Sequence, residues 1–263
     1  VAPGRYDQLG DQGGFNLDGR PLRIIAAQGP GMTTLVCSFG LNSACQAPAW
    51  IIGFGFDGGG ISGSAPVHVR NCRFEGTRGI RLDGQGTDVV IEDCAFMHCS
   101  ATGEGGGIRL ANLASGVIRR CRFRACQATS RGGAIYLNNN RKMEVEDCQF
   151  RDNATSGTGH GGAVCVEGGQ AIFRHCHFDG NRSPFGSGGG AYLDGTLTRG
   201  AVVFADCEFR NCEAQDFGGA VFDALVSQAT STISVGAGAF IQAGGNVTIA
   251  ASAISRVALT TPS

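Results

Sequence analysis

The sequence has little of what several common classes of protein require. Its Gly residues follow no three-residue period, which excludes a collagen-like chain. Its apolar runs, such as residues 201–205, are far too short to span a membrane. Its net charge of −1 gives no electrostatic reason to expect nucleic acid or an anionic membrane as a partner, and we expect no direct membrane insertion. No segment repeats its apolar residues with the period of an α-helix.

Glycine and apolar residues are abundant instead. The chain contains 44 Gly residues and 42 % apolar residues, a combination typical of many short strands joined by tight turns. It begins at Val1 without a signal peptide and ends in a stretch rich in Ser, Thr and Ala. We therefore expect it to be part of a longer or processed chain.

A repeated Cys-x-Phe unit is the main evidence for the fold. Successive Cys residues of the unit are 22, 27, 27, 28 and 31 residues apart, and an apolar residue stands three positions before each. A unit of this length cannot bury its apolar side alone, so we expect the units to stack as coils with parallel strands. The unit occurs at Cys72/Phe74, Cys94/Phe96, Cys121/Phe123, Cys148/Phe150, Cys176/Phe178 and Cys207/Phe209.

Weaker copies of the unit at Phe56 and Phe240 extend the pattern to eight Phe positions. We predict an all-β fold, a single-stranded right-handed parallel β-helix of about eight coils. It should form one domain, in which residues 1–48 are the first coil or cap, 49–250 the repeated coils, and 251–263 the C-terminal end or a linker.

The charged residues test this register independently. The position two residues before the first five of these Cys residues alternates in sign, and the next position nearly does so. Opposite charges that face each other across strands stabilise a sheet by up to about 1 kcal/mol per pair, so this order favours the proposed stacking. The first column is Arg70, Glu92, Arg119, Glu146 and Arg174, and the second is Asn71, Asp93, Arg120, Asp147, His175 and Asp206.

Inside the coils, the Phe residues should stack as an aromatic ladder beside one Cys per coil. A line of thiols suits neither the tetrahedral geometry of zinc nor the short Cβ separation of a disulfide. We therefore predict a column of buried, reduced thiols at Cys72, Cys94, Cys121, Cys148, Cys176 and Cys207.

Disulfide candidates lie elsewhere in the sequence. Cys99 and Cys126 should occupy the same turn on adjacent coils, and Cys37 and Cys45 flank a loop. Local bridges of the Cys94–Cys99 type compete with the first pair. Secretion would favour such bridges.

Two short motifs recur within the coils. Gly-Gly-Ala followed by Ile or Val combines with Phe-x-x-Asn, which is present at Asn153 and Asn181, while Cys99, Cys126 and Cys212 take the Asn position in other coils. Over roughly residues 50–250 this combination resembles the repeat of chlamydial polymorphic outer-membrane proteins and related β-helix surface proteins. The resemblance implies a pectin-lyase-like β-helix that serves as a surface passenger or adhesin. Residues 21–24 also resemble the first coil of pectate-lyase-type helices.

A catalytic role has weaker support. Asp93, Asp147 and Asp206 are the obvious acidic set, but two coils would separate them by about 9.6 Å, just beyond the range of glycosidase carboxyl pairs. We interpret them as rungs of a salt-bridge ladder, and the interposed Arg120 also disfavours calcium. His160, in a Gly-rich turn, is more typical of a surface residue than of a catalytic base. We predict no catalytic residue, no metal site and no cofactor.

Two surface features could serve recognition. One outward column should present Arg and aromatic side chains to a sugar or a protein, unless the long turn after each Phe covers it. Its candidate binding residues are Arg109, Tyr136, Tyr192 and Phe222. Glycosylation sequons begin at Asn153, Asn181 and Asn246, although in the first two the side chain could bond the backbone instead.

We therefore expect a non-catalytic structural or adhesive module of an extracellular, cell-surface or filament protein. Its partners would be other subunits, neighbouring domains of the same chain, or glycans. The alternatives are a polysaccharide lyase or hydrolase of the pectate-lyase type and a non-catalytic carbohydrate-binding module. The fold alone does not choose among them.

Overall fold

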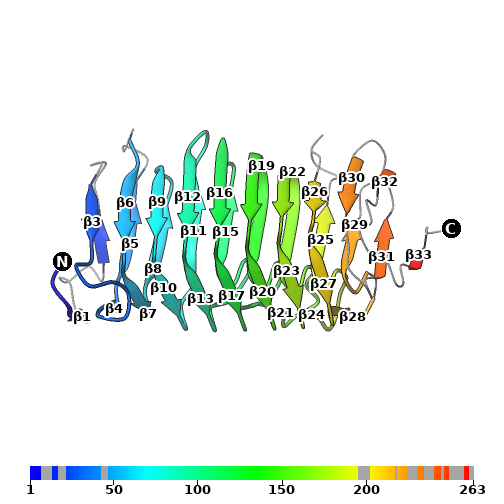
Figure 1. Cartoon of the computed structure of the whole chain (residues 1–263), viewed down its shortest axis with the longest axis horizontal. Helices are drawn as coiled ribbons and strands as arrows, with labels where there is room; N and C mark the ends of the chain where they lie inside the picture. Colours follow the sequence, from blue (N-terminus) through cyan, green and yellow to red (C-terminus); the bar gives the residue numbers. More distant parts are fainter. Residues whose placement is uncertain are drawn as a thin grey trace.

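The strands of this protein wind into coils that stack along one long axis (Figure 1). The computed structural model describes residues 1–6, 14–16, 22–42, 47–194, 202–216, 218–223, 230–233, 240–243, 246–248 and 258–260, with only the strand pairing for 14–16 and after 221. Within these residues all regular structure is β-strand or turn, and no helix could cross a membrane. Neighbouring strands are parallel in all three sheets, which confirms the predicted all-β coil architecture.

Two of the sheets receive one strand from each coil that contributes to them. Sheet A contains β1 (Gly4–Tyr6), β4 (Thr33–Leu35), β7 (Gly55–Asp57), β10 (Arg73–Glu75), β13 (Ala95–Met97), β17 (Arg122–Arg124), β20 (Gln149–Arg151), β23 (His177–Asp179) and β27 (Glu208–Arg210). Sheet C contains β14 (Ser100–Ala101), β18 (Gln127–Ala128), β21 (Ala154–Thr155), β24 (Arg182–Ser183) and β28 (Glu213–Ala214).

Sheet B consists of two rows of paired strands. Row B1 contains β2 (Gly14–Asn16), β5 (Ser38–Leu41), β8 (Gly60–Gly63), β11 (Gly79–Asp83), β15 (Ile108–Ala111), β25 (Ala191–Asp194), β29 (Val221–Asp223), β31 (Phe240–Ala243) and β33 (Ala258–Thr260). Row B2 contains β3 (Arg23–Ile25), β6 (Ala49–Ile52), β9 (Val67–Arg70), β12 (Asp88–Glu92), β16 (Ser115–Arg119), β26 (Val202–Ala205), β30 (Thr230–Ile233) and β32 (Asn246–Thr248). The long strands β19 (Ile135–Glu146) and β22 (Val164–Arg174) belong to both rows.

Each coil turns from row B2 into sheet A at one residue with a left-handed backbone. The φ angles at this corner lie between 50° and 55° in six coils. Asn, Asp and His adopt this conformation more readily than other residues with a side chain, which explains every identity except Arg120. The residues that the sequence suggested as a salt-bridge ladder therefore all lie at the corner between row B2 and sheet A, where they form the turn. They are Asn71, Asp93, Arg120, Asp147, His175 and Asp206.

Phenylalanine fills the centre of the coils as predicted. The ring centroids of successive Phe residues from Phe56 to Phe209 are 4.3–5.0 Å apart, and the ring planes are nearly parallel. Phe240 does not continue this column, because β31 pairs with β29 in sheet B and places Ile241 opposite Val221. Within the described residues, seven coils therefore carry the Phe column: Phe56, Phe74, Phe96, Phe123, Phe150, Phe178 and Phe209.

The stacking also includes segments near both ends of the chain. Before residue 49, β1 pairs with β4 and β3 pairs with β6, so this region supplies ordinary coil strands. Within residues 251–263, which the sequence suggested as an end or a linker, β33 pairs with β31. The repeated sheet pairing thus extends beyond residues 49–250.

Candidate functional site

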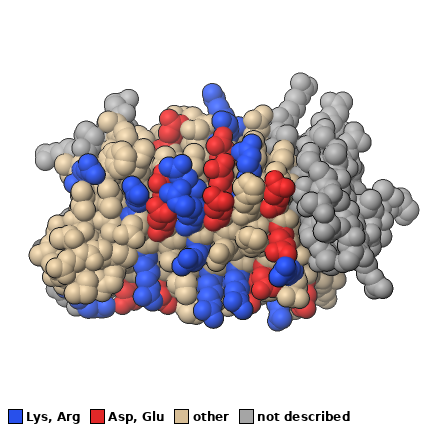
Figure 2. All heavy atoms as spheres, viewed as in Figure 1, with Lys and Arg blue, Asp and Glu red and all other residues tan. Residues whose placement is uncertain are grey.

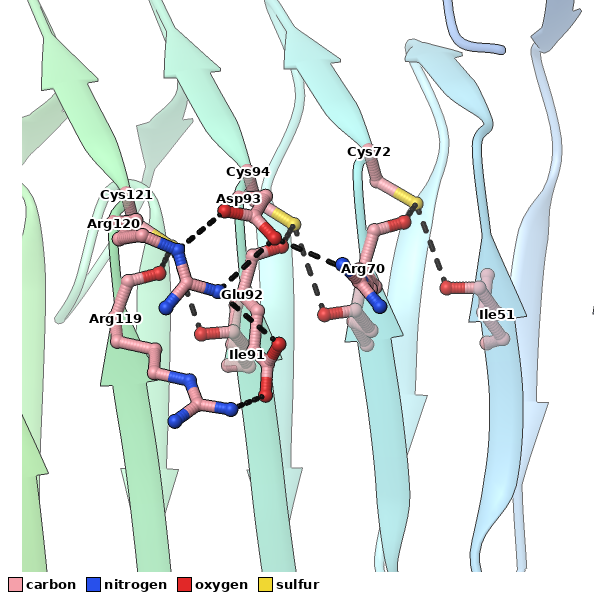
Figure 3. A network of polar contacts seen from close by, with 11 residues as sticks. Ile51, Arg70, Cys72, Ile91, Glu92, Asp93, Cys94, Arg119, Arg120 and Cys121 are labelled. Carbon is pink, nitrogen blue, oxygen red and sulfur yellow. Dashed lines mark hydrogen bonds and ion pairs between the residues drawn. The ribbon is translucent and has the colours of Figure 1, made fainter. Parts of the chain in front are cut away.

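The residue after each corner is a buried Cys, and Figure 3 shows three of them, Cys72, Cys94 and Cys121. The Cys94 thiol donates to the carbonyl of Glu92 at 3.1 Å and to that of Val69, in the preceding coil, at 3.8 Å. Cys121 makes the equivalent pair of contacts. Burial raises the pKa of the Cys94 and Cys121 thiols well above its usual range. Because the thiolate is the reactive form, Cys94 and Cys121 are suited to structure rather than chemistry, whereas hydrogen bonds from neighbouring thiols lower the pKa of Cys72 and Cys148 in the same column.

The disulfide candidates that lie within the described residues are free thiols. Cys99 and Cys126 donate to the carbonyls of Phe74 and Phe96, each at 3.5 Å, so both thiols point toward the coil before their own. Parallel stacking directs the two side chains the same way rather than toward each other, which corrects the proposed bridge. Cys37 is likewise a free, buried thiol, and Cys45 lies outside the described residues.

Asn153 and Asn181 are fully buried, which corrects their assignment as candidate glycosylation sites. The Asn153 side chain accepts a hydrogen bond from the Cys126 N–H at 2.9 Å and donates to the Phe123 carbonyl at 3.1 Å. A glycan on this nitrogen would have to occupy the interior of the coils. The side chain of Asn246 lies outside the described residues.

The alternating charges face each other in the predicted register. Glu92 lies opposite both Arg70 and Arg119, and Arg119 also lies opposite Glu146. Arg119 forms its ion pair with Glu92, at 2.6 Å, rather than with Glu146. Figure 2 shows the resulting bands of opposite charge on the middle coils, whereas the N-terminal end has few charges on this face.

The charged residues at the corners form further ion pairs between successive coils. Arg120 donates to Asp93 at 2.7 Å and also lies 3.4 Å from Glu92 (Figure 3). The hydrogen bond from Arg120 lowers the pKa of Asp93. The Asp93 carboxylate is therefore kept ionised and is paired with an Arg of the next coil.

The candidate binding face has the predicted register but is partly covered. Arg109, Tyr136, Cys165, Tyr192 and Phe222 lie opposite one another in turn along row B1. Tyr136 is only 3 % exposed, so it does not present a ring to solvent. For Phe222 only the backbone pairing is described.

Two residues that the sequence did not indicate cover this face. Tyr136 donates a hydrogen bond to the carboxylate of Glu167, and Arg131, from the loop after β18, forms an ion pair with the same carboxylate. Glu167 follows Cys165 by two positions in β22, so the alternation of a strand could have placed it on the outer face. Nothing in the sequence indicated that the loop would return over it.

The titratable groups on this face favour their neutral or paired forms. The His160 ring stacks on Tyr192 with centroids 4.4 Å apart, and burial, aided by Arg131, lowers the pKa of His160. Burial and the nearby Asp194 raise the pKa of Tyr192 to about 12. Burial also raises the pKa of Cys165 well above its usual range. The arrangement is that of a packed structural cluster rather than of an activated nucleophile and base.

Hollows on the described surface contain few acidic groups. The larger, a groove of about 410 Å³, is lined by residues of sheet C and its flanking turns, and Asp93, Asp147 and Asp206 are not among them. In the described parts of the chain, no group of three or more His, Cys, Asp or Glu residues could hold a metal ion.

The comparisons with known proteins agree with this architecture. A family model described as a right-handed β-helix region matches residues 51–127 and 104–257, which together cover most of the chain. Comparisons with curated proteins and with solved structures give no match. The chain therefore belongs to the right-handed β-helix family.

Proposed function

We propose that this chain is a non-catalytic structural rod that serves as an adhesive module on a cell surface or in an extracellular filament. The observation that carries the proposal is that its side chains contact the side chains of neighbouring coils. The interior is filled by stacked Phe rings and buried thiols, and outward charges such as Arg119 and Glu92 pair from one coil to the next. Such a molecule is built for rigidity along its axis.

The resemblance of the Gly-Gly-Ala and Phe-x-x-Asn repeat to surface β-helix proteins supports the same proposal. The free thiols are compatible with an extracellular location if the chain folds before it meets an oxidant, because burial then protects them. Partners would be neighbouring domains or subunits.

The location can be tested at one side chain. Lys142 is the only lysine in the sequence, and its side chain is 61 % exposed. A membrane-impermeant amine reagent applied to intact cells that make the full-length protein should modify Lys142, as detected by mass spectrometry of the peptide that contains it. A Lys142→Arg variant is the matched control. Modification only after cell lysis would overturn the proposed location.

The absence of catalysis needs its own experiment. The full chain is incubated with neutral and acidic polysaccharides, and the length of the sugar chains is followed by size-exclusion chromatography. We expect no shortening. Shortening by the folded chain that the heat-unfolded chain does not produce would instead support the lyase or hydrolase alternative.

A further inference from the structure

A column of thiols runs through the interior of six successive coils. The strands on both sides of the corner pair in register, so each Cys of the column lies one strand spacing, about 4.8 Å, from the next. Their side chains are at most 4 % exposed, and successive thiols are hydrogen-bond partners along the whole column. The thiol column consists of Cys72, Cys94, Cys121, Cys148, Cys176 and Cys207.

Backbone carbonyl oxygens line the thiol column. Each thiol contacts two of them, one in its own coil and one in the preceding coil, at 3.1–3.8 Å. For Cys72 these are the oxygens of Arg70 and Ile51 (Figure 3). The negative ends of the carbonyl dipoles therefore face the sulfur atoms, and such an environment stabilises a cation.

The spacing of the thiols fits one class of metal ion. In the described residues no group of three or more ligands could hold a metal ion, which excludes a tetrahedral zinc site. Each gap between successive thiols offers two sulfur atoms in a line instead. Cu(I) is a soft ion that thiolates select, and it accepts two ligands in a line. With copper–sulfur bonds of about 2.3 Å, a linear bridge spans about 4.6 Å, close to the strand spacing of about 4.8 Å.

The exchange of a proton for Cu(I) leaves the charge of the interior unchanged. The S–H bond of one Cys breaks, a copper–sulfur bond forms to each of the two sulfur atoms, and the proton leaves to solvent. The bridge then contains one thiolate, one thiol and one monovalent cation, so no net charge is buried. Burial raises the pKa of Cys94 well above its usual range, but a coordinated metal ion displaces a thiol proton outright.

We propose that the thiol column binds Cu(I), with one ion in each gap between successive coils. Six thiols enclose five gaps, so the loaded column holds five ions and keeps one thiol proton. Cys99 and Cys126 also contact two carbonyls each and form one further gap of the same kind. The sequence alone predicted no metal site because a line of thiols cannot surround zinc, and an ion with two ligands removes that objection. This inference does not depend on the proposed adhesive role or on where the rod is located.

Titration of the reduced full chain with Cu(I) tests the proposal. The ion is supplied without oxygen from a buffer that contains a Cu(I)-specific chelator. Native mass spectrometry counts the bound ions, and X-ray absorption at the copper edge gives the number of sulfur ligands. We expect two sulfur atoms at about 2.2–2.3 Å from each copper and the release of one proton per ion. Zn(II) should not load the column.

Serine variants locate the site, because a hydroxyl still donates to the carbonyls but is a poor ligand for a soft ion. Cys121→Ser removes an inner sulfur of the column and should cost two ions. Cys207→Ser removes the last sulfur and should cost one. Cys165→Ser is the matched control, because Cys165 is a free, fully buried thiol outside the column, and this variant should cost none.

Three results would each overturn the proposal: the chain takes up no Cu(I), each copper has three sulfur ligands, or Cys121→Ser and Cys165→Ser lose equal numbers of ions. Unchanged urea unfolding of the variants without copper excludes misfolding as the cause. The X-ray absorption of the parent chain decides the ligand number even if the inner variant does not fold.

Discussion

The side-chain oxygen of Asn181 accepts two hydrogen bonds from Asn153, one from its backbone N–H at 3.1 Å and one from its side-chain amide at 2.9 Å. The two residues lie on successive coils. Asn153 contacts Cys126 of the preceding coil in the same way, through its own side-chain oxygen. These buried amides satisfy backbone groups at a corner where the regular strand pairing is interrupted.

We expect Asn153→Ala to destabilise the rod. The substitution leaves the buried Cys126 N–H and Phe123 carbonyl without this partner, and each unsatisfied group costs about 1–3 kcal/mol. Urea unfolding followed by circular dichroism measures the loss. Gln149→Ala, at an exposed position of sheet A, should change stability by less than about 0.5 kcal/mol. Equal stability of the two variants would contradict the buried role of Asn153.

The sequence predicted those features that repeat with the coil. The Phe column and the alternation of Arg119 with Glu92 and Glu146 followed from aligning the Cys-x-Phe units, because stacking brings equal positions together. The alignment failed at Phe240, although it held at Phe56, where the Cys is missing as well.

The features that the sequence did not predict depend on backbone conformation and on loop paths. Asp93 and Arg120 were recognisable as members of one column, and Asp is compatible with a left-handed corner, but Arg rarely adopts one and so obscured the pattern. The cover of Arg131 over Glu167 depends on a loop that returns to the outer face, and loop length varies between coils. Local pattern does not determine such tertiary contacts.

The aromatic column should dominate the stability of the core. Phe123 is 1 % exposed and stacks on Phe96 and Phe150, so Phe123→Ala should cost about 3–5 kcal/mol. Phe185→Ala, at a residue that is 56 % exposed, provides the comparison and should have little effect. The urea midpoints of the two variants measure the difference. A small loss at Phe123 would mean that the rings do not stack as described.

The thiols should be free and protected. We expect a thiol-specific reagent to react slowly with the folded chain, mainly at the half-buried Cys212, and with all twelve cysteines after unfolding without reductant. Burial raises the pKa of Cys212 to about 11, so its reaction should accelerate as the pH approaches that value. Fewer than twelve reactive thiols in the unfolded chain would reveal disulfides.

Reversing one charge should disrupt the outer ladder. Arg119→Glu places a carboxylate between Glu92 and Glu146, and like charges opposite each other destabilise a sheet by up to about 1 kcal/mol per pair. A second change, Glu92→Arg, restores one pair of opposite charges and should recover part of the loss. Urea unfolding at low and high salt measures both. No recovery in the double variant would show that the Arg119–Glu92 ion pair contributes little.

The ion pair between Arg131 and Glu167 lies over the candidate binding face. It should couple the effects that substitutions of these two residues have on stability. Arg131→Met leaves the buried Glu167 carboxylate without its cation, and removal of one partner of a fully buried pair typically costs about 3–5 kcal/mol. We expect a smaller loss of about 1–3 kcal/mol, because the Arg131 side chain is 40 % exposed and Tyr136 still donates to the carboxylate.

The penalty in Arg131→Met comes from the uncompensated charge of Glu167, so its removal should reverse the loss. Glu167→Gln added to Arg131→Met should therefore restore much of the stability, and a double-mutant cycle measured by urea unfolding isolates this coupling. Met keeps most of the length of the Arg stem, which limits the loss of packing in the comparison. Additive losses would instead mean that water reaches Glu167 and that the loop of Arg131 does not seal the face.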